Sequence, residues 1–237
     1  MTVSDVNMSA EHQKYRAEVT KGAGLRFISH LDYAALFQRA ICRAKLPAAY
    51  SEGFNPHMKM SFASALPLGV RSESEYMDFE LKEPLQGIEV YKKLGTQLPP
   101  EVKIKRIAMI HGKHKALMAE MDMAEYEVIL PYSGTADDVH DAITRFKHAG
   151  EALFHRVTPK KTRDIDAKKY VRSIEYHIEG DRLLLNLAIA SGSTGSIKPG
   201  EVLNVLNEQF SLYIEPYQAD ICRTAIKSGG RPLIELV

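Results

Sequence analysis

Apolar and polar residues alternate along several short segments of the first half of the chain, and segments with helical spacing lie between them. Tyr15, Ala17 and Val19 are separated by single polar residues, which is the period of two expected for a strand. Further strands are predicted at residues 58–62, 77–81 and 102–105, helices at residues 31–45 and 88–94, and a turn at residues 67–74. The resulting order β-α-β-β-α-β is the ferredoxin-like pattern.

The second half of the chain repeats this pattern in part. Strands are predicted at residues 126–130, 153–157 and 212–223, helices at 139–146 and 202–206, and a hairpin at 174–189 around Gly180-Asp181. We therefore expect an α+β protein with two ferredoxin-like (βαββαβ) domains in tandem, the second one decorated. The predicted boundaries are 1–12 for a flexible tail, 13–112 for the first domain and 113–237 for the second, with a connector at 111–123.

Composition narrows the class of protein. Apolar residues make up 45% and charged residues 26% of the chain, which is ordinary for a globular protein. No segment approaches the roughly 20 apolar residues of a membrane span, and the N-terminus lacks the pattern of a signal peptide. We therefore expect a cytoplasmic protein with no membrane partner.

The two cysteines, Cys42 and Cys222, lie far apart in sequence and form no C-x-x-C pair. A cluster of three or four cysteines is what an iron–sulfur or cysteine-rich zinc site requires. We expect neither a metal nor a cofactor. The formal net charge is only +1, so any contact with nucleic acid must come from a local patch.

The first predicted helix carries such a patch. Asp32, Arg39 and Arg43 lie within about 40° of one line on its surface, because each residue turns the helix by about 100°. Arginines four residues apart repel each other unless an anion lies between them. The pattern favours a bound carboxylate or phosphate. The alternative is a solvated helix face on which Asp32 or Glu52 is the local partner.

The loop that follows this helix gathers aromatic, amide and imidazole groups. Gly53 permits a positive φ, and Pro56 keeps Asn55 extended. Such groups can stack on a base and form hydrogen bonds with it, although a structural turn with Tyr50 and Phe54 in the core is the alternative. The predicted substrate-binding set comprises Asp32, Arg39, Arg43, Tyr50, Ser51, Asn55, His57 and Lys59.

Two histidines of the same region are the candidate catalytic residues. Histidine is the residue type suited to acid–base chemistry at neutral pH, such as RNA cleavage, and the two histidines are His30 and His57. Together with Asp32 or Glu75 they could also hold a metal, although their spacing matches no known metal motif. Structural histidines are the favoured interpretation, so the catalytic residues stay open and no metal site is assigned.

A second basic region spans His155–Arg172, from within the predicted element at 153–157 to just before the one at 174–178. Seven basic residues stand there against two acidic ones, and one aromatic residue lies among them, as in segments that follow a nucleic-acid backbone. The predicted nucleic-acid-binding set is Arg156, Lys160, Lys161, Arg163, Lys168, Lys169, Tyr170 and Arg172. A solvated basic loop is the alternative.

The glycine- and serine-rich segment 192–196 precedes the last predicted helix. Its backbone amides and the helix N-terminus could bind a phosphate. The spacing is not that of a P-loop, and a mobile loop is the favoured interpretation.

Four segments and one further residue carry a resemblance to a known family: Arg26–Asp32, Arg39–Pro47, Tyr50–His57, Ala65–Gly69 and Glu75. They resemble the bacterial radical-SAM-linked protein family, a domain of unknown function encoded beside, or fused to, a radical SAM protein of the B12-binding type. The resemblance implies an association with a radical SAM protein encoded nearby. Since this chain lacks a cysteine cluster motif, it would be the separate partner of that enzyme.

We therefore expect an accessory, substrate-binding partner of a radical SAM enzyme, related to RNA. The tandem plan also resembles that of CRISPR repeat-processing endoribonucleases, which keeps a metal-independent endoribonuclease as one alternative. A protein-binding scaffold without catalysis is the other alternative. Fold alone does not decide among the three.

Overall fold

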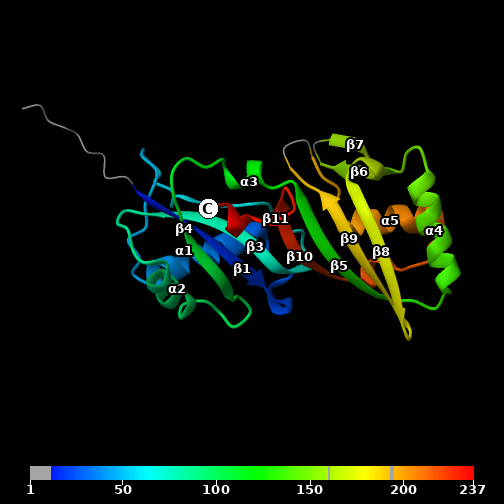
Figure 1. Ribbon diagram of the computed structural model, residues 1–237, viewed down its shortest axis with the longest axis horizontal. Coiled ribbons are helices and arrows are strands. Elements are labelled where there is room, and N and C mark those ends of the chain that lie inside the picture. Colours follow the sequence, from blue (N-terminus) through cyan, green and yellow to red (C-terminus); the bar gives the residue numbers. More distant parts are fainter. Residues whose placement is uncertain (1–11, 160, 193–194) are drawn as a thin grey trace, which may run out of the picture.

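The computed structural model describes residues 12–159, 161–192 and 195–237 (Figure 1). The predicted tail therefore lies outside the described residues, except for His12. Lys160, Ser193 and Thr194 also lie outside them.

The first half has the predicted order of elements. Its elements are β1 (Gln13–Lys21), η1 (Ala23–Leu25), α1 (His30–Arg43), β2 (Met60–Phe62), β3 (Val70–Leu81), α2 (Gly87–Gly95) and β4 (Ile104–Ile110). The predicted turn at 67–74 is too long, because the chain turns at Gly69, which has a φ of 83°, and then extends at once into β3.

The second half is more decorated than the first. Its elements are α3 (Leu117–Glu120), β5 (Met123–Pro131), α4 (Ala136–His148), β6 (Leu153–Thr158), β7 (Lys161–Asp166), η2 (Ala167–Lys169), β8 (Val171–Glu179), β9 (Arg182–Ala190), α5 (Pro199–Phe210), η3 (Pro216–Gln218), β10 (Asp220–Ser228), β11 (Arg231–Pro232) and η4 (Leu233–Leu236).

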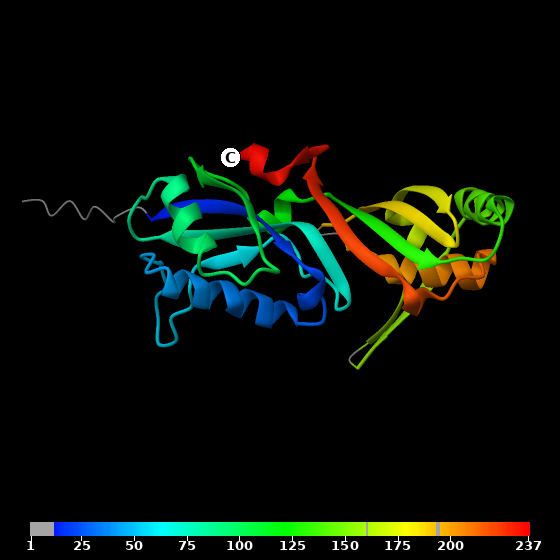
Figure 2. The same ribbon diagram turned by 90° about the horizontal axis from the view of Figure 1, so that it is seen from below.

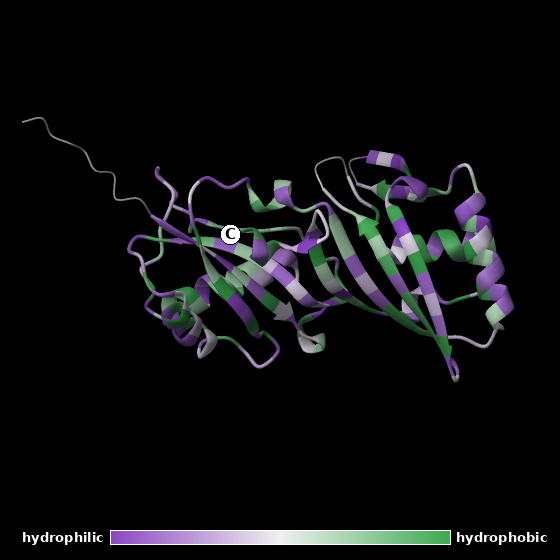
Figure 3. Ribbon diagram, in the orientation of Figure 1, coloured by the Kyte–Doolittle hydropathy of each residue, from purple (hydrophilic) through white to green (hydrophobic). Residues whose placement is uncertain are grey.

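Two details of the second half differ from the predictions. Part of the basic stretch is the regular strand β7, which pairs with β6 as a separate two-stranded hairpin. The last long strand begins at Asp220 and not at Leu212, since Pro216 starts a 3-10 turn ahead of it. In contrast, the β8–β9 hairpin turns at Gly180, which has a φ of 62°. Figure 3 shows hydrophobic and hydrophilic residues alternating along these two strands.

A large, mostly antiparallel sheet joins the two halves into one mixed α+β fold. Its strand order is β4-β1-β3-β10-β5-β9-β8, with β2 paired to β3 and β11 paired to β10. Among the described strands, β3 and β10 alone are parallel, over Val70–Ser72 and Ile221–Arg223. The prediction of two separate ferredoxin-like domains in tandem is not confirmed, because β10 from the end of the chain lies between the strands of the two halves.

Apolar side chains fill one face of the sheet in each half. In the first half, Ala17 and Val19 of β1 pack with Phe37 and Ile41 of α1, and all four are fully buried. The apolar face of α1 and the apolar face of β1 thus form one core. In the second half, α4 and α5 pack in the same way against β5 and β9. Figure 2 shows α1 lying along the sheet on one side.

The opposite face of the first half is also covered, by α3 and η4. Arg16 is fully buried there and donates to Asp78 at 2.8 Å, to Glu120 at 2.7 Å and to the carbonyl of Leu233 at 2.9 Å. The polar side of β1 is therefore buried, and its Arg16 is paired there with acidic side chains. No helix among the described residues has the length and apolar character needed to cross a membrane.

Candidate functional site

The first candidate site lies beside the C-terminal half of α1. The hydroxyl of Ser29 accepts from the backbone of Asp32 and thereby starts the helix. The helix ends at Arg43, after which Lys45 adopts a φ of 53° and Pro47 follows. These features return the chain toward the sheet.

The loop from Ser51 to His57 closes on itself. The backbone of Ser51 donates to the carbonyl of His57 at 2.8 Å, and the backbone of His57 donates to the Ser51 hydroxyl at 3.0 Å. Tyr50 and Met58 form a β-bridge next to this closure. The closure brings His57 close to Tyr50, seven residues earlier in the chain.

Helix α1 and the loop that follows it line an open pocket of about 520 Å³, here called the α1 pocket. Its lining residues are Gln38, Arg39, Cys42, Arg43, Tyr50, Pro56, His57 and Met58. Four residues of the predicted substrate-binding set, Arg39, Arg43, Tyr50 and His57, thus line one pocket. Their role in binding remains a prediction.

The two arginines of the α1 pocket differ in their partners. Arg43 donates to the backbone carbonyl of Gln97 at 2.6 Å. Within the described part of the chain, Arg39 makes no hydrogen bond or ion pair, and its side chain is exposed. The Tyr50 hydroxyl lies 3.9 Å from the Cys42 sulfur, and this hydrogen bond is the main cause of the raised pKa of Tyr50. Arg39 is therefore the cation available to a ligand.

The remaining predicted residues lie outside the α1 pocket. Asp32 was expected to orient a guanidinium, but its carboxylate accepts from the Ser29 hydroxyl at 2.6 Å. It lies about two helical turns before Arg39 and about three before Arg43. Lys59 pairs with Glu80 at 3.3 Å. Asn55 is exposed on the loop, and Ser51 shapes the loop as described above.

The two candidate catalytic histidines are not brought together. The ring of His30 packs edge-on against Phe62, with 5.4 Å between ring centres, whereas His57 lines the α1 pocket. Glu75, considered as a metal ligand, is paired with Arg223. Across residues 12–159, 161–192 and 195–237, no three histidine, cysteine, aspartate or glutamate side chains are grouped as a metal site requires.

The basic segment of the second half mixes internal and exposed cations. Arg156 forms an ion pair with the buried Glu201. Lys168 donates to the carbonyls of Phe146 at 2.9 Å and Lys147 at 2.6 Å, near the C-terminus of α4. Both side chains therefore stabilise the fold.

The other cations of the basic segment face solvent. Those with exposed side chains among the described residues are Lys161, Arg163, Lys169 and Arg172. The β6–β7 hairpin projects from the body of the protein, as Figure 2 shows. Tyr170 is half-buried against the core of the second half. The described part of the segment thus retains a smaller set of cations for a ligand than the sequence predicts.

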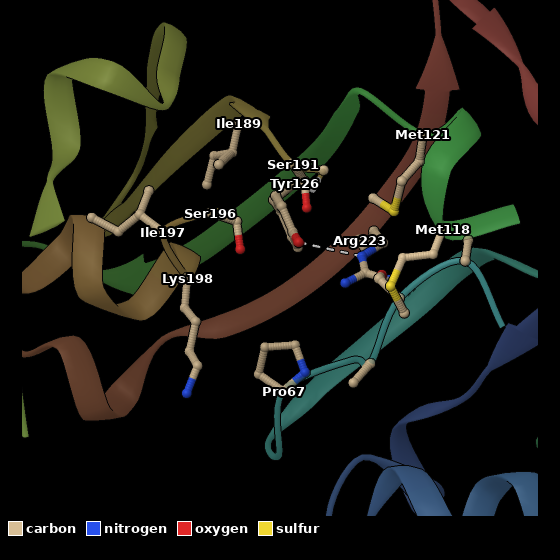
Figure 4. A pocket seen from close by; sticks show the side chains of 14 residues that line it. Pro67, Met118, Met121, Tyr126, Ile189, Ser191, Ser196, Ile197, Lys198 and Arg223 are labelled. Carbon is tan, nitrogen blue, oxygen red and sulfur yellow. Dashed lines mark hydrogen bonds between the residues drawn. The ribbon is translucent and has the colours of Figure 1, made fainter. Parts of the chain in front are cut away.

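A second pocket, here called the central pocket, lies where the two halves of the sheet meet (Figure 4). It has a volume of about 240 Å³, and Arg223 of β10 and Tyr126 of β5 contribute to its lining. Neither residue was predicted from the sequence to belong to a site. The local signals were Glu75, part of the family resemblance, and the segment 192–196, whose Gly192 and Ser196 line the pocket.

Comparison with known proteins places the chain in a family. The model of the family described as "Uncharacterized protein conserved in bacteria (DUF2344)" matches residues 14–199. The chain therefore belongs to this family. The match includes the α1 pocket, the basic segment and the loop ahead of α5. No curated protein matches the chain.

A solved structure shows a related fold. A chain in the crystal structure of a Cbf5-Nop10-Gar1 complex superposes with a TM-score of 0.52 at 14% sequence identity. The alignment covers 96% of this chain and 52% of that chain, so this protein spans about half the length of its neighbour. A structure of an unknown protein from Galdieria sulphuraria, at 12% identity with 92% and 99% of the chains covered, gives a TM-score of 0.27. The first likeness concerns the fold alone.

Proposed function

We propose that this protein is the accessory, substrate-binding partner of a radical SAM enzyme and holds an anionic, nucleotide-like part of an RNA in the α1 pocket. The observation that carries the proposal is the exposed guanidinium of Arg39, without a protein partner in the described chain, next to Tyr50 and His57 in one pocket. The association with a radical SAM enzyme comes from the family resemblance of Arg26–Asp32 and the segments that follow it.

The chemistry of the α1 pocket suits a phosphate with an attached base. A guanidinium forms paired, charge-assisted hydrogen bonds with phosphate oxygens. Arg43 is held in place by the carbonyl of Gln97, so its charge has a fixed position four residues from Arg39. An anion between the two would remove their mutual repulsion. The rings of Tyr50 and His57 offer surfaces for stacking on a base.

The lining favours binding over catalysis. No carboxylate is among the described residues that line the α1 pocket, and His57 is its one imidazole. Cleavage of RNA by acid–base chemistry needs two groups that exchange protons with the substrate. His30, the other candidate, packs against Phe62 and is not among the residues that line the α1 pocket. An accessory role explains a charged pocket of this kind without requiring a second catalytic group.

The basic segment would extend the contact with RNA. Figure 2 shows the β6–β7 hairpin projecting to the same side of the sheet as α1. Lys161 and Arg163 are exposed on this hairpin, and cations that neutralise phosphates make affinity fall as salt rises. Because the net charge of the chain is only +1, we expect weak binding by the protein alone.

The experiment compares Arg39→Gln with a matched control, Lys92→Gln on the exposed surface of α2. Binding of a fluorescent single-stranded RNA is followed by anisotropy at low and at physiological salt. Losing a charge-assisted hydrogen bond to phosphate costs about 1.5–3 kcal/mol, so Arg39→Gln should weaken binding by about tenfold or more. Lys92→Gln should bind as the wild type does. Equal affinities for all three proteins would refute the RNA site.

A second measurement tests the partner. The radical SAM protein encoded nearby is purified with the wild type and with Arg39→Gln, and both complex formation and turnover of RNA are measured. We expect both proteins to form the complex and only the wild type to support turnover. A complex without any RNA binding would favour the scaffold alternative. Absence of a complex would refute the association.

A further inference from the structure

The central pocket is built from segments that lie far apart in the sequence. Strand β10 lies between β3 and β5, and its register shifts between Arg223 and Ala225. A bulge of this kind changes the direction in which a side chain points. Figure 4 shows the Arg223 guanidinium directed into the pocket, with Tyr126 beside it and Lys198 on the opposite wall.

Arg223 is held rigidly by its neighbours. Its side chain lies in the protein interior, with 2% of the residue exposed. Nη1 donates to the two oxygens of Glu75 at 2.9 and 3.1 Å and to the Ser64 hydroxyl at 2.9 Å, and Nε donates to the Tyr126 hydroxyl at 3.3 Å. Within the described chain, Nη2 has no acceptor. The N–H donors at the Nη2 end of a fixed guanidinium are therefore available to a ligand.

The charges around Glu75 do not balance. Lys21 is also fully buried, and its ammonium donates to the carbonyl of Ile28 at 3.0 Å. Burial lowers the pKa of Lys21, and the charge of Arg223 acts in the same direction while that of Glu75 opposes it. Glu75 forms an ion pair with Arg223, and Lys21 is a second buried cation whose pKa both of them affect. An unbalanced charge in the interior is costly, and a bound anion would offset that cost.

The rest of the lining combines hydroxyl groups with apolar surface. Ser191 and Ser196 present hydroxyls, and the exposed Lys198 adds a cation at the first residue ahead of α5. Met118 and Met121 of the α3 segment supply flexible apolar surface that adapts to different shapes. A ligand that fits would carry an anionic group at one end and an apolar body at the other.

We propose that the central pocket binds a small amphipathic acid, whose carboxylate or phosphate accepts from Nη2 of Arg223 and whose apolar body lies against Met118 and Met121. The volume of about 240 Å³ is below the roughly 300–1,000 Å³ of pockets for drug-sized ligands. The ligand is therefore smaller than a complete nucleotide. This site is separate from the α1 pocket and does not depend on RNA binding there.

The test uses three probes of similar size: benzoate, phenyl phosphate and the uncharged benzamide. Thermal unfolding of the full chain is followed with each probe at millimolar concentration. We expect benzoate or phenyl phosphate to raise the melting temperature by a few degrees, because a ligand that binds only the folded state stabilises it. Benzamide should have no effect. The acid that shifts the melting temperature more identifies the anionic group.

Two variants locate the effect. Ser191→Leu places a bulky side chain in the pocket, and Lys198→Gln removes an exposed cation at its edge with little risk to folding. Both should reduce the shift, whereas Asn186→Ala, an exposed site on the preceding strand β9, should leave it unchanged. Arg39→Gln should also leave it unchanged, which separates this proposal from the RNA site. A shift that persists in both pocket variants, or equal shifts with benzoate and benzamide, would overturn the proposal.

Discussion

The polar side of β1 and the α1 pocket both contain arginines, and these arginines have opposite roles. Arg16 is fully buried and bonded to Asp78, Glu120 and the carbonyl of Leu233. Arg39 is exposed, and the described chain offers it no partner. The same side chain therefore joins three segments of the fold in one region and is available to a ligand in the other.

This difference shows how the second face of the sheet is closed. Glu120 belongs to α3 and Leu233 to η4, so Arg16 attaches two short elements to β1. Neither element has enough apolar surface for a large core, and a small cluster around Leu117, Met121 and Leu233 completes the contact. Polar bonds thus determine where the C-terminal segment lies on the sheet.

The largest predicted effect comes from Arg16→Met, which removes the buried cation and leaves the buried Asp78 with Lys14, at 3.4 Å, as its remaining cationic partner in the described chain. Breaking a buried ion pair on one side costs about 3–5 kcal/mol, and we expect a loss of that size in the free energy of unfolding in urea. The control Arg39→Met removes a cation from the α1 pocket and should change stability by less than about 0.5 kcal/mol. Equal losses in the free energy of unfolding for the two variants would contradict a structural role for Arg16 that Arg39 lacks.

The elements were predictable from the sequence because they follow local patterns. The alternation of Tyr15, Ala17 and Val19 with Arg16, Glu18 and Thr20 identifies β1 correctly. It cannot show whether the polar side faces water. Arg16 and Asp78 are both buried, because the covering residues Glu120 and Leu233 lie more than 100 residues after Arg16 in the chain.

The two pockets also differ in how far apart in the sequence their residues lie. The α1 pocket was predictable because Arg39, Arg43, Tyr50 and His57 lie on one helix and the loop just beyond it. Glu75 and Arg223 are 148 residues apart, and they meet only because β10 inserts between the two halves. A single sequence contains no periodic signal for such a pairing. The same insertion explains why two separate domains were expected.

The second prediction applies the comparison to two adjacent lysines of the basic segment. Lys168 donates to the carbonyls of Phe146 and Lys147, whereas Lys169 is exposed and lies 4.0 Å from Asp166. Lys168→Gln should lower the free energy of unfolding by about 1.5–3 kcal/mol, since a charged donor is lost. Lys169→Gln should change it by less than about 0.5 kcal/mol and lower the salt dependence of RNA binding instead. A larger loss of stability for Lys169→Gln than for Lys168→Gln would contradict the structural role of Lys168 and the solvent-facing role of Lys169.

The third prediction concerns Arg43, which belongs to the α1 pocket but is bonded to the carbonyl of Gln97. Arg43→Ala should destabilise the protein by about 1 kcal/mol, because one hydrogen bond to an exposed region is lost. It should also weaken RNA binding, although less than Arg39→Gln does. Thermal unfolding and RNA anisotropy on the same samples check both effects. A loss of stability as large as that of Arg16→Met would make Arg43 a structural residue.

The smallest predicted effect concerns the pH dependence of stability at the buried Lys21. Its pKa is lowered in the folded protein, chiefly by burial. Between this lowered pKa and the ordinary value near 10.5, the unfolded chain binds more protons than the folded one. The contribution of Lys21 to the free energy of unfolding therefore rises with pH across this range, as the cost of its buried charge disappears.

Tyr33, whose ring lies 5.6 Å from the Lys21 ammonium, acts in the opposite direction. Its pKa is raised, chiefly by burial, so stability is lost above its ordinary value near 10 when the unfolded chain ionises first. The variant Lys21→Met keeps Tyr33 and removes only the rise in the free energy of unfolding with pH that comes from Lys21. The difference in unfolding free energy, wild type minus variant, should therefore increase with pH between 7 and the alkaline end of the range. A flat difference would mean that Lys21 is as well balanced by Glu75 as Arg16 is by its two carboxylates, and the charge excess next to the central pocket would then not exist.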